Sequence, residues 1–324
     1  MTLMSFMTII FFVLLVGVGI AIGQLRSLFA AVMLSGIFSL LSAALFVLMD
    51  AVDVAFTEAA VGAGISTVLM LMVLYLTSEK EAKSSEVKLF PLLIAVLCGA
   101  VLLYATHDMP HFGDPDAYIH KSSTTYHYLY NTYEESHIPN TVTTILASYR
   151  GYDTLGETTV VLTAAISVMM LMGRKKEEER EIAIDKDTII DVGSKMLTPY
   201  ILLFALYVQF HGDFGPGGGF QAGVMFAAAY ILHALGTGVA NTQRAASARV
   251  IEKLIPTGVL IYAGVGVWCL VKGGKFLEYN VLSPEHPAHG QHLGILLVEL
   301  GVGITVCSAM LMIFYKFALR GKKV

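Results

Sequence analysis

Residues 211–223, with the sequence HGDFGPGGGFQAG, form a polar and glycine-rich segment between two strongly apolar runs. Three consecutive glycines allow the backbone to turn tightly and to approach a neighbouring segment, and the proline fixes one dihedral angle. The pattern predicts a reversal of chain direction, with a turn formed by Pro216, Gly217, Gly218 and Gly219. His211 and Asp213 precede the turn and are candidate groups for a proton or cation path.

Three acidic residues lie inside apolar runs: Glu58, Glu157 and Glu299. Removing water from a carboxylate is costly, so an acid in such a run is a candidate for a functional site with a partner. Glu299 is the deepest of the three, at roughly 10 Å into its run if that run is helical. For Glu58 an alternative is that its side chain reaches the polar headgroups at the membrane surface.

The segment RGYDTLGE, residues 150–157, opens another apolar run with charges of both signs. Arg150, Asp153 and Glu157 could act as a charge relay at the outer mouth of an ion path. Asp153 is also placed to cap the following helix at its N-terminus, and acids near a helix N-terminus are stabilised by the helix dipole without any further role. We favour the ion path for Glu157 and capping alone for Asp153.

The composition indicates a membrane protein. Hydrophobic residues make up 56% of the 324 residues, charged residues only 14%, and the mean hydropathy is +0.69. A chain this apolar is a polytopic membrane protein and not a soluble one. The formal net charge of −4 gives no indication of nucleic-acid binding.

The sequence contains no pattern for a cofactor or metal. The cysteines Cys98, Cys269 and Cys307 lie in apolar runs without a CxxC pair, and we expect them to be buried. Nucleotide loops, flavin fingerprints, haem ligand pairs and iron–sulfur cysteine sets are absent from the sequence. The His and Asp residues at 107–120 match no recognised metal spacing. His286, His289 and His292 have a spacing that could suggest a metal, but we expect Pro287 to interrupt a helix there. We therefore expect no cofactor, no metal and no redox catalysis by this chain.

Nine apolar runs are long enough to cross a membrane as helices, which takes about 20 residues each. The predicted fold is an all-α polytopic membrane protein with spans at 4–22, 27–48, 54–76, 89–105, 154–173, 194–211, 218–239, 254–272 and 292–316. No basic residue precedes the first run, so we expect it to be a retained helix and not a cleaved signal peptide.

The basic residues predict the orientation, because cytoplasmic loops are enriched in Lys and Arg. With the N-terminus outside and the C-terminus inside, all but four of the 21 basic residues lie on the inner side. The inner loops 78–88 and 174–187 are expected to be solvated. The long outer segment 106–152, rich in His, Asp and Tyr, is expected to be a folded flap that packs on partner subunits.

Three motifs resemble known families. The pattern HG-x-x-x-PGGGFQ-x-G and residues 292–306 resemble the B subunit of Mrp-type Na+/H+ antiporters. RG-aromatic-DTLGE resembles the E subunit of membrane-bound hydrogenases. Residues 53–64 resemble the hydrogenase D subunit, and these last two motifs also resemble the C-terminal part of the large antiporter subunit. The 53–64 segment departs from the antiporter form, where we expect Gln at position 58 and Glu at position 62.

The resemblances imply a fusion with three parts. Residues 1–88 are the D-like region with three helices, residues 89–188 the E-like region with two helices and an extracytoplasmic loop, and residues 189–324 the B-like region with four helices. The family implies an accessory subunit of a multisubunit complex in the cell membrane of a prokaryote. Its partners would be the other membrane subunits, Na+ and H+, and the lipid bilayer, with no nucleic acid.

Three functional hypotheses remain open from the sequence. The first is a subunit of an Mrp-type antiporter that lines the outer part of the ion pathway. The second is the same module in an ion-translocating redox complex resembling membrane-bound hydrogenase, which the register of Glu58 slightly favours. The third is a structural subunit whose acids serve as helix caps and interface charges.

Overall fold

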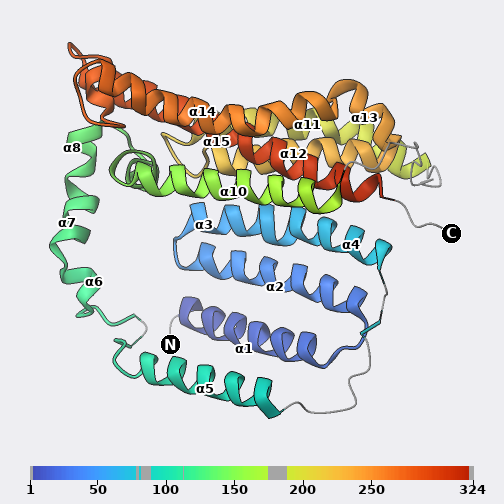
Figure 1. The fold of residues 1–324 in the computed structure, drawn as a ribbon. Coiled ribbons are helices and arrows are strands. Elements are labelled where there is room, and N and C mark those ends of the chain that lie inside the picture. Colours follow the sequence, from blue (N-terminus) through green and yellow to red (C-terminus); the bar gives the residue numbers. More distant parts are fainter. Residues whose placement is uncertain (1–2, 78–79, 82–88, 112, 174–187, 321–324) are drawn as a thin grey trace.

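The computed structural model describes residues 3–77, 80–81, 89–111, 113–173 and 188–320, and within these ranges the secondary structure is helical apart from one isolated bridge between Ser27 and Lys80 (Figure 1). Nine helices in the described ranges are long and apolar enough to span a membrane, as predicted. The expectations for the loop 174–187 and for most of the linker 78–88 lie outside the described residues.

The N-terminal part is a helical layer of α1 (Leu3–Gln24), α2 (Leu28–Leu48) and a third span. The third span consists of α3 (Val52–Thr57), a π-helical segment (Glu58–Ser66) and α4 (Thr67–Leu76). Short π-helical segments occur often at functional sites, and this one begins at Glu58. Ser39 of α2 is buried against it, so the carboxyl group of Glu58 lies at a contact between two helices.

The next span, α5 (Leu89–Thr106), lies apart from the other long helices in Figure 1. The short helices α6 (Tyr118–Lys121), α7 (Ser123–Tyr130) and α8 (Thr132–Ser136) then run along one end of the molecule towards α10. No residue of α5 is buried, although the structure describes the whole helix. Such an apolar helix is suited to contact with lipid or with helices of another chain.

The fifth span, α10 (Gly151–Met172), corrects one expectation. Its N-cap residue is Arg150, and Asp153 lies inside the first turn without capping it. The reason is that α9 (Thr141–Thr144) and a π-helical turn (Ile145–Tyr149) lead directly into α10, so the helix begins before Asp153, whose backbone N–H donates to the carbonyl oxygen of Arg150. Asp153 instead forms an ion pair with Arg150.

The C-terminal part is the most closely packed. It comprises α11 (Thr188–His211), α12 (Gly219–Thr237), the short α13 (Val239–Ala245), α14 (Ala248–Val271), a 3₁₀ turn (Tyr279–Leu282) and α15 (Pro287–Ala318). Small residues allow the helices to approach closely. For example, a Cβ atom on Gly258 of α14 would lie 2.2 Å from the carbonyl oxygen of Gly301 of α15.

The start of α15 corrects a second expectation. Pro287 does not interrupt a helix but begins one, at the first helical position, where its missing N–H group costs nothing. The last span is consequently 32 residues long. Glu299 is its thirteenth residue and lies about 18 Å from its start, deeper than the sequence alone predicted.

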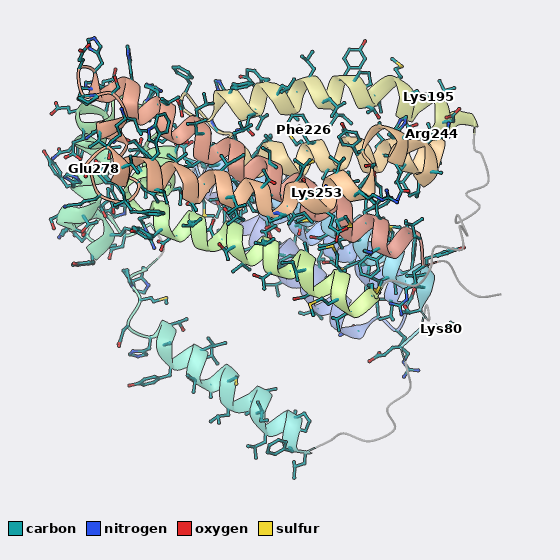
Figure 2. The ribbon with its side chains drawn as sticks, turned by 45° about the horizontal axis from the view of Figure 1, so that its top comes forward. Lys80, Lys195, Phe226, Arg244, Lys253 and Glu278 are labelled. Atoms are coloured by element: carbon teal, nitrogen blue, oxygen red, sulfur yellow. The ribbon has the colours of Figure 1, made fainter. Side chains whose placement is uncertain are left out.

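The two ends of the helical bundle differ in charge. In Figure 2, Glu278 lies at one end of the bundle, and Lys80, Lys195 and Arg244 lie at the other, basic end. The glycine turn follows α11 at the end of that helix away from Lys195, and this end is called the glycine-turn end. Successive spans alternate between the two ends. This distribution agrees with the predicted orientation, in which the basic end faces the cytoplasm, and the orientation itself stays a prediction.

Candidate functional site

The glycine turn joins α11 to α12, and each of its glycines meets a different constraint. Gly218 has φ +109°, a conformation that residues with a side chain rarely adopt. A Cβ atom on Gly217 would lie 2.6 Å from the carbonyl oxygen of Val208, and one on Gly219 only 1.9 Å from that of Glu299. Three glycines in a row therefore bring the N-terminus of α12 directly against the backbone of α15 at Glu299.

A segment about 70 residues earlier in the chain fixes the turn in place. The side-chain amide of Asn140 donates to the carbonyl oxygens of Gly212 (3.0 Å) and Gly215 (2.9 Å), and the Thr143 hydroxyl also donates to Gly212 (2.7 Å). The Asn140 side-chain oxygen caps α9 at the same time. Asn140 and Thr143 thus hold the turn by hydrogen bonds that its own sequence cannot supply, and neither was predicted as a site residue.

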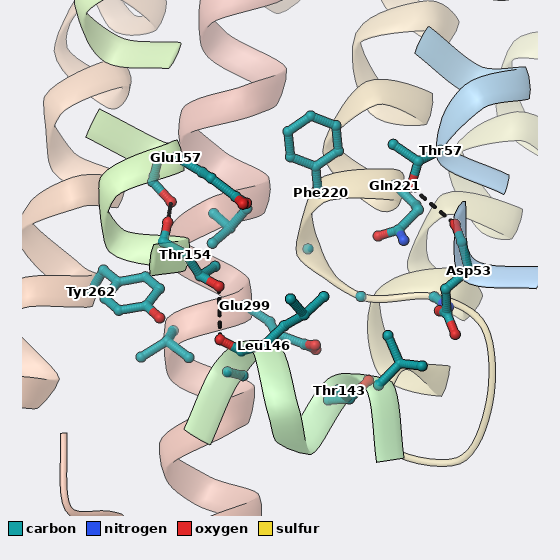
Figure 3. Close-up of a pocket in the computed structure, with 18 residues that line it drawn as sticks. Asp53, Thr57, Thr143, Leu146, Thr154, Glu157, Phe220, Gln221, Tyr262 and Glu299 are labelled. Atoms are coloured by element: carbon teal, nitrogen blue, oxygen red, sulfur yellow. Dashed lines mark hydrogen bonds between the residues drawn. The ribbon is translucent and has the colours of Figure 1, made fainter. Parts of the chain in front are cut away.

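A cavity of about 210 Å³ lies between this turn, the third span, the start of α10 and the middle of α15 (Figure 3). Three carboxylate residues from three separate regions line it: Asp53, Glu157 and Glu299. Gly217, Gly218 and Gly219 form another part of the wall, and the polar lining also includes Thr57, Thr143, Thr154, Thr158, Gln221 and Tyr262. The structure therefore brings two of the three predicted acids together with the predicted turn.

Glu299 occupies the point where the turn meets α15. A Cβ atom on Gly212 would lie 3.0 Å from its Oε2 and one on Gly218 would lie 2.8 Å from its Oε1, so its carboxylate lies against the glycine backbone. Among the described residues, no group donates a hydrogen bond to this carboxylate. The negative charges of Asp213 and Asp53 act on it. An acid without a local partner beside a cavity can accept a proton or a cation from that cavity.

Asp53 is an acid of this cavity that the sequence analysis did not predict as a site residue. Its Oδ1 accepts a hydrogen bond from the backbone N–H of Gly217 at 3.2 Å, which joins the third span to the glycine turn across 164 positions. It lies in the first turn of α3, where an acid is normally explained by the helix dipole. The sequence shows that Asp53 lies between two apolar runs, which could have marked it as a site residue. Glu58 lies further inside an apolar run, so the same criterion favoured Glu58.

The remaining predicted residues lie around the cavity without lining it. Asp213 Oδ2 is 2.7 Å from Nδ1 of His292, and the ring of His211 stacks on Tyr207. Arg150 and Asp153 form an exposed ion pair at 2.6 Å. Glu58 lies in the π-helical segment, close to Ser39 and Gly62.

Two buried tyrosines form hydrogen bonds with the backbone next to the start of α10. The Tyr262 hydroxyl donates to the carbonyl oxygen of Gly151, and the Tyr279 hydroxyl donates to that of Ala147, both at 2.8 Å. Burial raises the pKa of Tyr279, which lies outside the spans, so its hydroxyl keeps its proton and remains a donor. These bonds fasten the turn before α10, and so the position of Glu157, to the C-terminal helices.

Gln209 of α11 adds a polar group to the interior near this site. Its side-chain oxygen faces Gly303, one turn of α15 beyond Glu299, where a Cβ atom would lie 2.7 Å away. The side chain is buried, and its Nε2 has no hydrogen-bond partner among the described residues. A buried donor without a partner costs free energy, so a packing role alone does not account for an amide at this position.

The long loop also packs inward. The chain from Ile138 to Tyr149 lies against the glycine turn and the C-terminal helices, with Ile138 1% exposed. The Tyr149 hydroxyl donates to Glu135, and burial together with this bond raises the pKa of Tyr149 to about 12. The second half of the predicted flap is thus part of this chain's own site, while its contact with partner subunits stays a prediction.

The described residues contain no group of three or more His, Cys, Asp or Glu side chains arranged to hold a metal ion. Of the cysteines expected to be buried, Cys269 is buried and Cys307 partly buried, but Cys98 is exposed. Cys98 belongs to α5, which packs on little of its own chain, and the prediction was therefore wrong for this residue.

Three family models match consecutive parts of the chain. Residues 2–79 match the D subunit of MBH, residues 88–188 match the E subunit of MBH, and residues 189–312 match the domain related to the MnhB subunit of Na+/H+ antiporters. The order D-like, E-like, B-like is the one predicted from the motifs. The fold and this order define a multi-span membrane protein assembled from three subunit-like regions.

Solved structures support the same architecture. A chain of the Mrp complex from Dietzia sp. DQ12-45-1b has a TM-score of 0.74 and 23% identity, covering 97% of this chain and 35% of that one. A chain of the membrane-bound sulfane sulfur reductase, an archaeal respiratory membrane complex, has a TM-score of 0.56 and 28% identity, covering 71% of this chain and 97% of that one.

A curated relative establishes the family. The B subunit of the Na+/H+ antiporter of Alkalihalophilus pseudofirmus is 30% identical over 129 residues, and the match covers 89% of its length and 37% of this chain. This chain therefore belongs, through its C-terminal four-helix part, to the family of Na+/H+ antiporter B subunits. The chain spans 60% and 34% of the length of two other curated relatives.

Proposed function

We propose that this protein is a membrane subunit of an Mrp-type multisubunit Na+/H+ antiporter and that it lines the outer part of a cation or proton pathway. In this proposal it assembles with large antiporter subunits and with small helical ones in a prokaryotic cell membrane. It transports ions only within that complex and is not itself a redox catalyst. Its family membership and its likeness to antiporter subunits along the whole chain support the proposal.

The observation that carries the proposal is the convergence of Asp53, Glu157 and Glu299 on one cavity beside the glycine turn. Carboxylates exchange protons, and their oxygen atoms are the ligands that hard cations such as Na+ prefer. The positive end of the α12 dipole faces the same point and favours negative charge there. Alternating occupancy of one acidic site by a proton and a cation would couple the movements of the two ions.

The charged group at the start of α10 completes the proposed outer mouth. Arg150 and Asp153 are exposed and paired, at 61% and 52% side-chain exposure, whereas Glu157 lies one turn further along and lines the cavity. We assign Glu157 to the path and the Arg150–Asp153 pair to its entrance. His211 and Asp213 precede the glycine turn and do not line the cavity, and we assign them a role in setting its charge.

The test is neutralisation of the acids in the assembled complex. Glu299→Gln should lower Na+-dependent proton flux at least tenfold with normal yield of the complex, and Glu157→Gln should lower it less. Glu285→Gln is the matched control, because Glu285 is exposed at the same end and does not line the cavity. Unchanged flux and unchanged yield in Glu299→Gln and Glu157→Gln would refute the proposal. A lower yield with normal flux per complex would support the structural-subunit hypothesis instead.

A redox-driven complex is the second candidate. The matches of residues 2–188 to the D and E subunits of MBH, and the likeness to a chain of an archaeal respiratory complex, favour it. The two candidates differ in their partners. Purification in mild detergent through a tag at Val324, followed by mass spectrometry, should recover only membrane subunits for an antiporter. Co-purification of cysteine-rich iron–sulfur subunits would decide for the redox complex.

A further inference from the structure

A second cavity lies at the basic end of the same pair of helices, where α11 begins and α12 ends. Its volume is about 310 Å³, and every residue that lines it is polar or glycine: Asp191, Lys195, His233, Gly236, Thr237 and Asn241. The cavity at the glycine-turn end, by contrast, has an apolar component from Leu146, Phe220 and Val298. A fully polar cavity in the ends of membrane helices is suited to water and protons.

Close packing at one glycine shapes this cavity. A Cβ atom on Gly236 would lie 1.9 Å from Oγ of Ser194, so α11 and α12 touch there. Gly238 follows with φ +96° and ends α12. Asn241 of α13 then donates to the carbonyl oxygen of Thr237 at 2.7 Å, which closes the cavity from the side of α13.

His233 is the titratable group of α12 in this cavity, and α11 places two charged groups beside it. Lys195 Nζ is 2.7 Å from Asp191 Oδ2, with side-chain exposures of 58% and 32%. Arg244 lies on α13 at the same end but does not line the cavity (Figure 2). In the described part of the chain no group forms a hydrogen bond with the imidazole ring of His233, so both ring nitrogens are left for water in the cavity.

We propose that this cavity is a proton-exchange site at the membrane face opposite to Glu299, and that His233 is the group that binds the proton. Histidine is the side chain that ordinarily changes charge between about pH 5 and 8. A proton from water binds to the unprotonated ring nitrogen and returns to water by the reverse step, so no other reactant is needed. Protonated His233 competes with Lys195 for the carboxylate of Asp191, which links the proton to an ion pair at the start of α11.

The two cavities lie at opposite ends of α12, because Gly219 and His233 are 14 positions apart, or about 21 Å along a helix. The unpaired amide of Gln209 lies near the glycine-turn end of α11, where its side chain is buried. The N-terminus of α12 therefore lies at the acidic cavity, and its C-terminal part lies at the histidine cavity. Proton exchange at His233 does not depend on the proposed function. The inference rests on the proposed function only where it links the exchanged proton to ion transport.

The first test does not depend on transport. Diethyl pyrocarbonate reacts with neutral imidazole, so the rate at which it modifies His233 in the purified complex, measured by peptide mass spectrometry, reports protonation of the ring. We expect modification under native conditions and a rate that falls when the pH is lowered, because a protonated ring does not react. Absence of modification in the folded complex, or a rate that does not change with pH, would overturn the proposal.

The second test is the pH profile of ion transport. His233→Gln should remove a pH-dependent step seen when pH is varied on the side of the basic end, and should reduce flux several-fold. His289→Gln is the matched control, because His289 is exposed at the glycine-turn end, far from this cavity. Two results together would overturn this inference and leave the proposed function intact. They are a wild-type pH profile in the His233→Gln complex and a loss of flux in the separate Glu299→Gln complex. Normal flux in Glu299→Gln would refute the proposed function. The diethyl pyrocarbonate test would then still show whether His233 exchanges protons with water.

Discussion

The spans α1 and α5 differ from α12 and α15 in burial, and hydropathy does not account for the difference, because α15 is 61% buried at a mean hydropathy of 2.2 and α11 is 11% buried at 1.5. The spans α1 and α5 have mean hydropathies of 2.7 and 2.4 but bury only 6% and 0% of their residues within the chain, whereas α12, at 1.3, buries 50%. In a membrane, apolar side chains gain little by leaving lipid, so helices associate through small residues and polar contacts. Hydropathy therefore locates the spans, and glycine and hydrogen-bonding residues locate the core.

The largest expected difference between the two regions concerns glycine. Gly219→Ala places a Cβ atom 1.9 Å from the carbonyl oxygen of Glu299, and because the obstacle is backbone we expect a loss of about 3 kcal/mol or more. Gly17→Ala in α1, where no atom lies within 4 Å of the added carbon, should be neutral or slightly stabilising. Denaturation of the purified protein by SDS measures both. Equal effects of the two changes would contradict the comparison.

Buried hydrogen bonds should give the next largest difference. Tyr279→Phe leaves the carbonyl oxygen of Ala147 without its 2.8 Å donor, and we expect it to destabilise the protein by about 1–3 kcal/mol. Tyr104→Phe in α5 removes the same atom from a side chain that is 81% exposed, and should change little. The same denaturation measurement applies, and a loss of stability in Tyr104→Phe as large as in Tyr279→Phe would show that α5 is packed in a way this chain alone does not reveal.

Gln209 and Gln291 are two buried glutamines that differ in their hydrogen bonds, so replacing each by leucine should affect stability differently. Gln209→Leu removes an amide without a partner, so we expect stability to be unchanged or higher by about 1 kcal/mol. Gln291→Leu removes hydrogen bonds to Ser148 and Asn280 and should be destabilising by about 1–3 kcal/mol. A clear loss of stability in Gln209→Leu would mean that its amide is satisfied by water, and flux through the complex should then fall as well.

The smallest effect should come from the exposed ion pair at the start of α10. Asp153→Asn removes a pair whose members are more than half exposed, and we expect a change of about 0.5 kcal/mol or less that disappears at high salt. Asp213→Asn, which breaks the contact with His292 at 16% side-chain exposure of the acid, should cost more. Denaturation at low and high salt compares the two, and a larger, salt-independent loss in Asp153→Asn would contradict this ranking.

Much of the fold follows from the sequence because its strongest signals are local. Runs such as 3–24 and 89–106 are apolar throughout, and a helix is the structure that satisfies every backbone group of a single segment in lipid. The ends of spans were less predictable. Gly151 and Pro287 begin helices several residues before the hydropathy pattern does, because neighbouring turns and a proline at the first helical position can start a helix in polar sequence.

The candidate site was predictable only in part. Glu157, Glu299 and the three glycines were identified from their types and neighbours, and the structure places all of them at one cavity. Asn140 and Asp53 were not identified, because their roles depend on contacts across about 70 and 164 positions, with Gly212 and Gly217 respectively. Hydrogen bonds between distant segments leave no periodicity or spacing in a sequence.

The sequence by itself determined that this chain is a multi-span membrane protein, where the nine candidate spans of the described residues lie, which residues form the glycine turn, and which family its motifs resemble. The reason is that membrane solvation acts on each segment separately. Only the tertiary structure decided which acids meet, that Glu58 does not line the cavity of Asp53 and Glu299, and that α11 and α12 form a polar cavity at the basic end. Those properties depend on which helix faces approach each other, and that is set by close packing at glycine and by long-range hydrogen bonds.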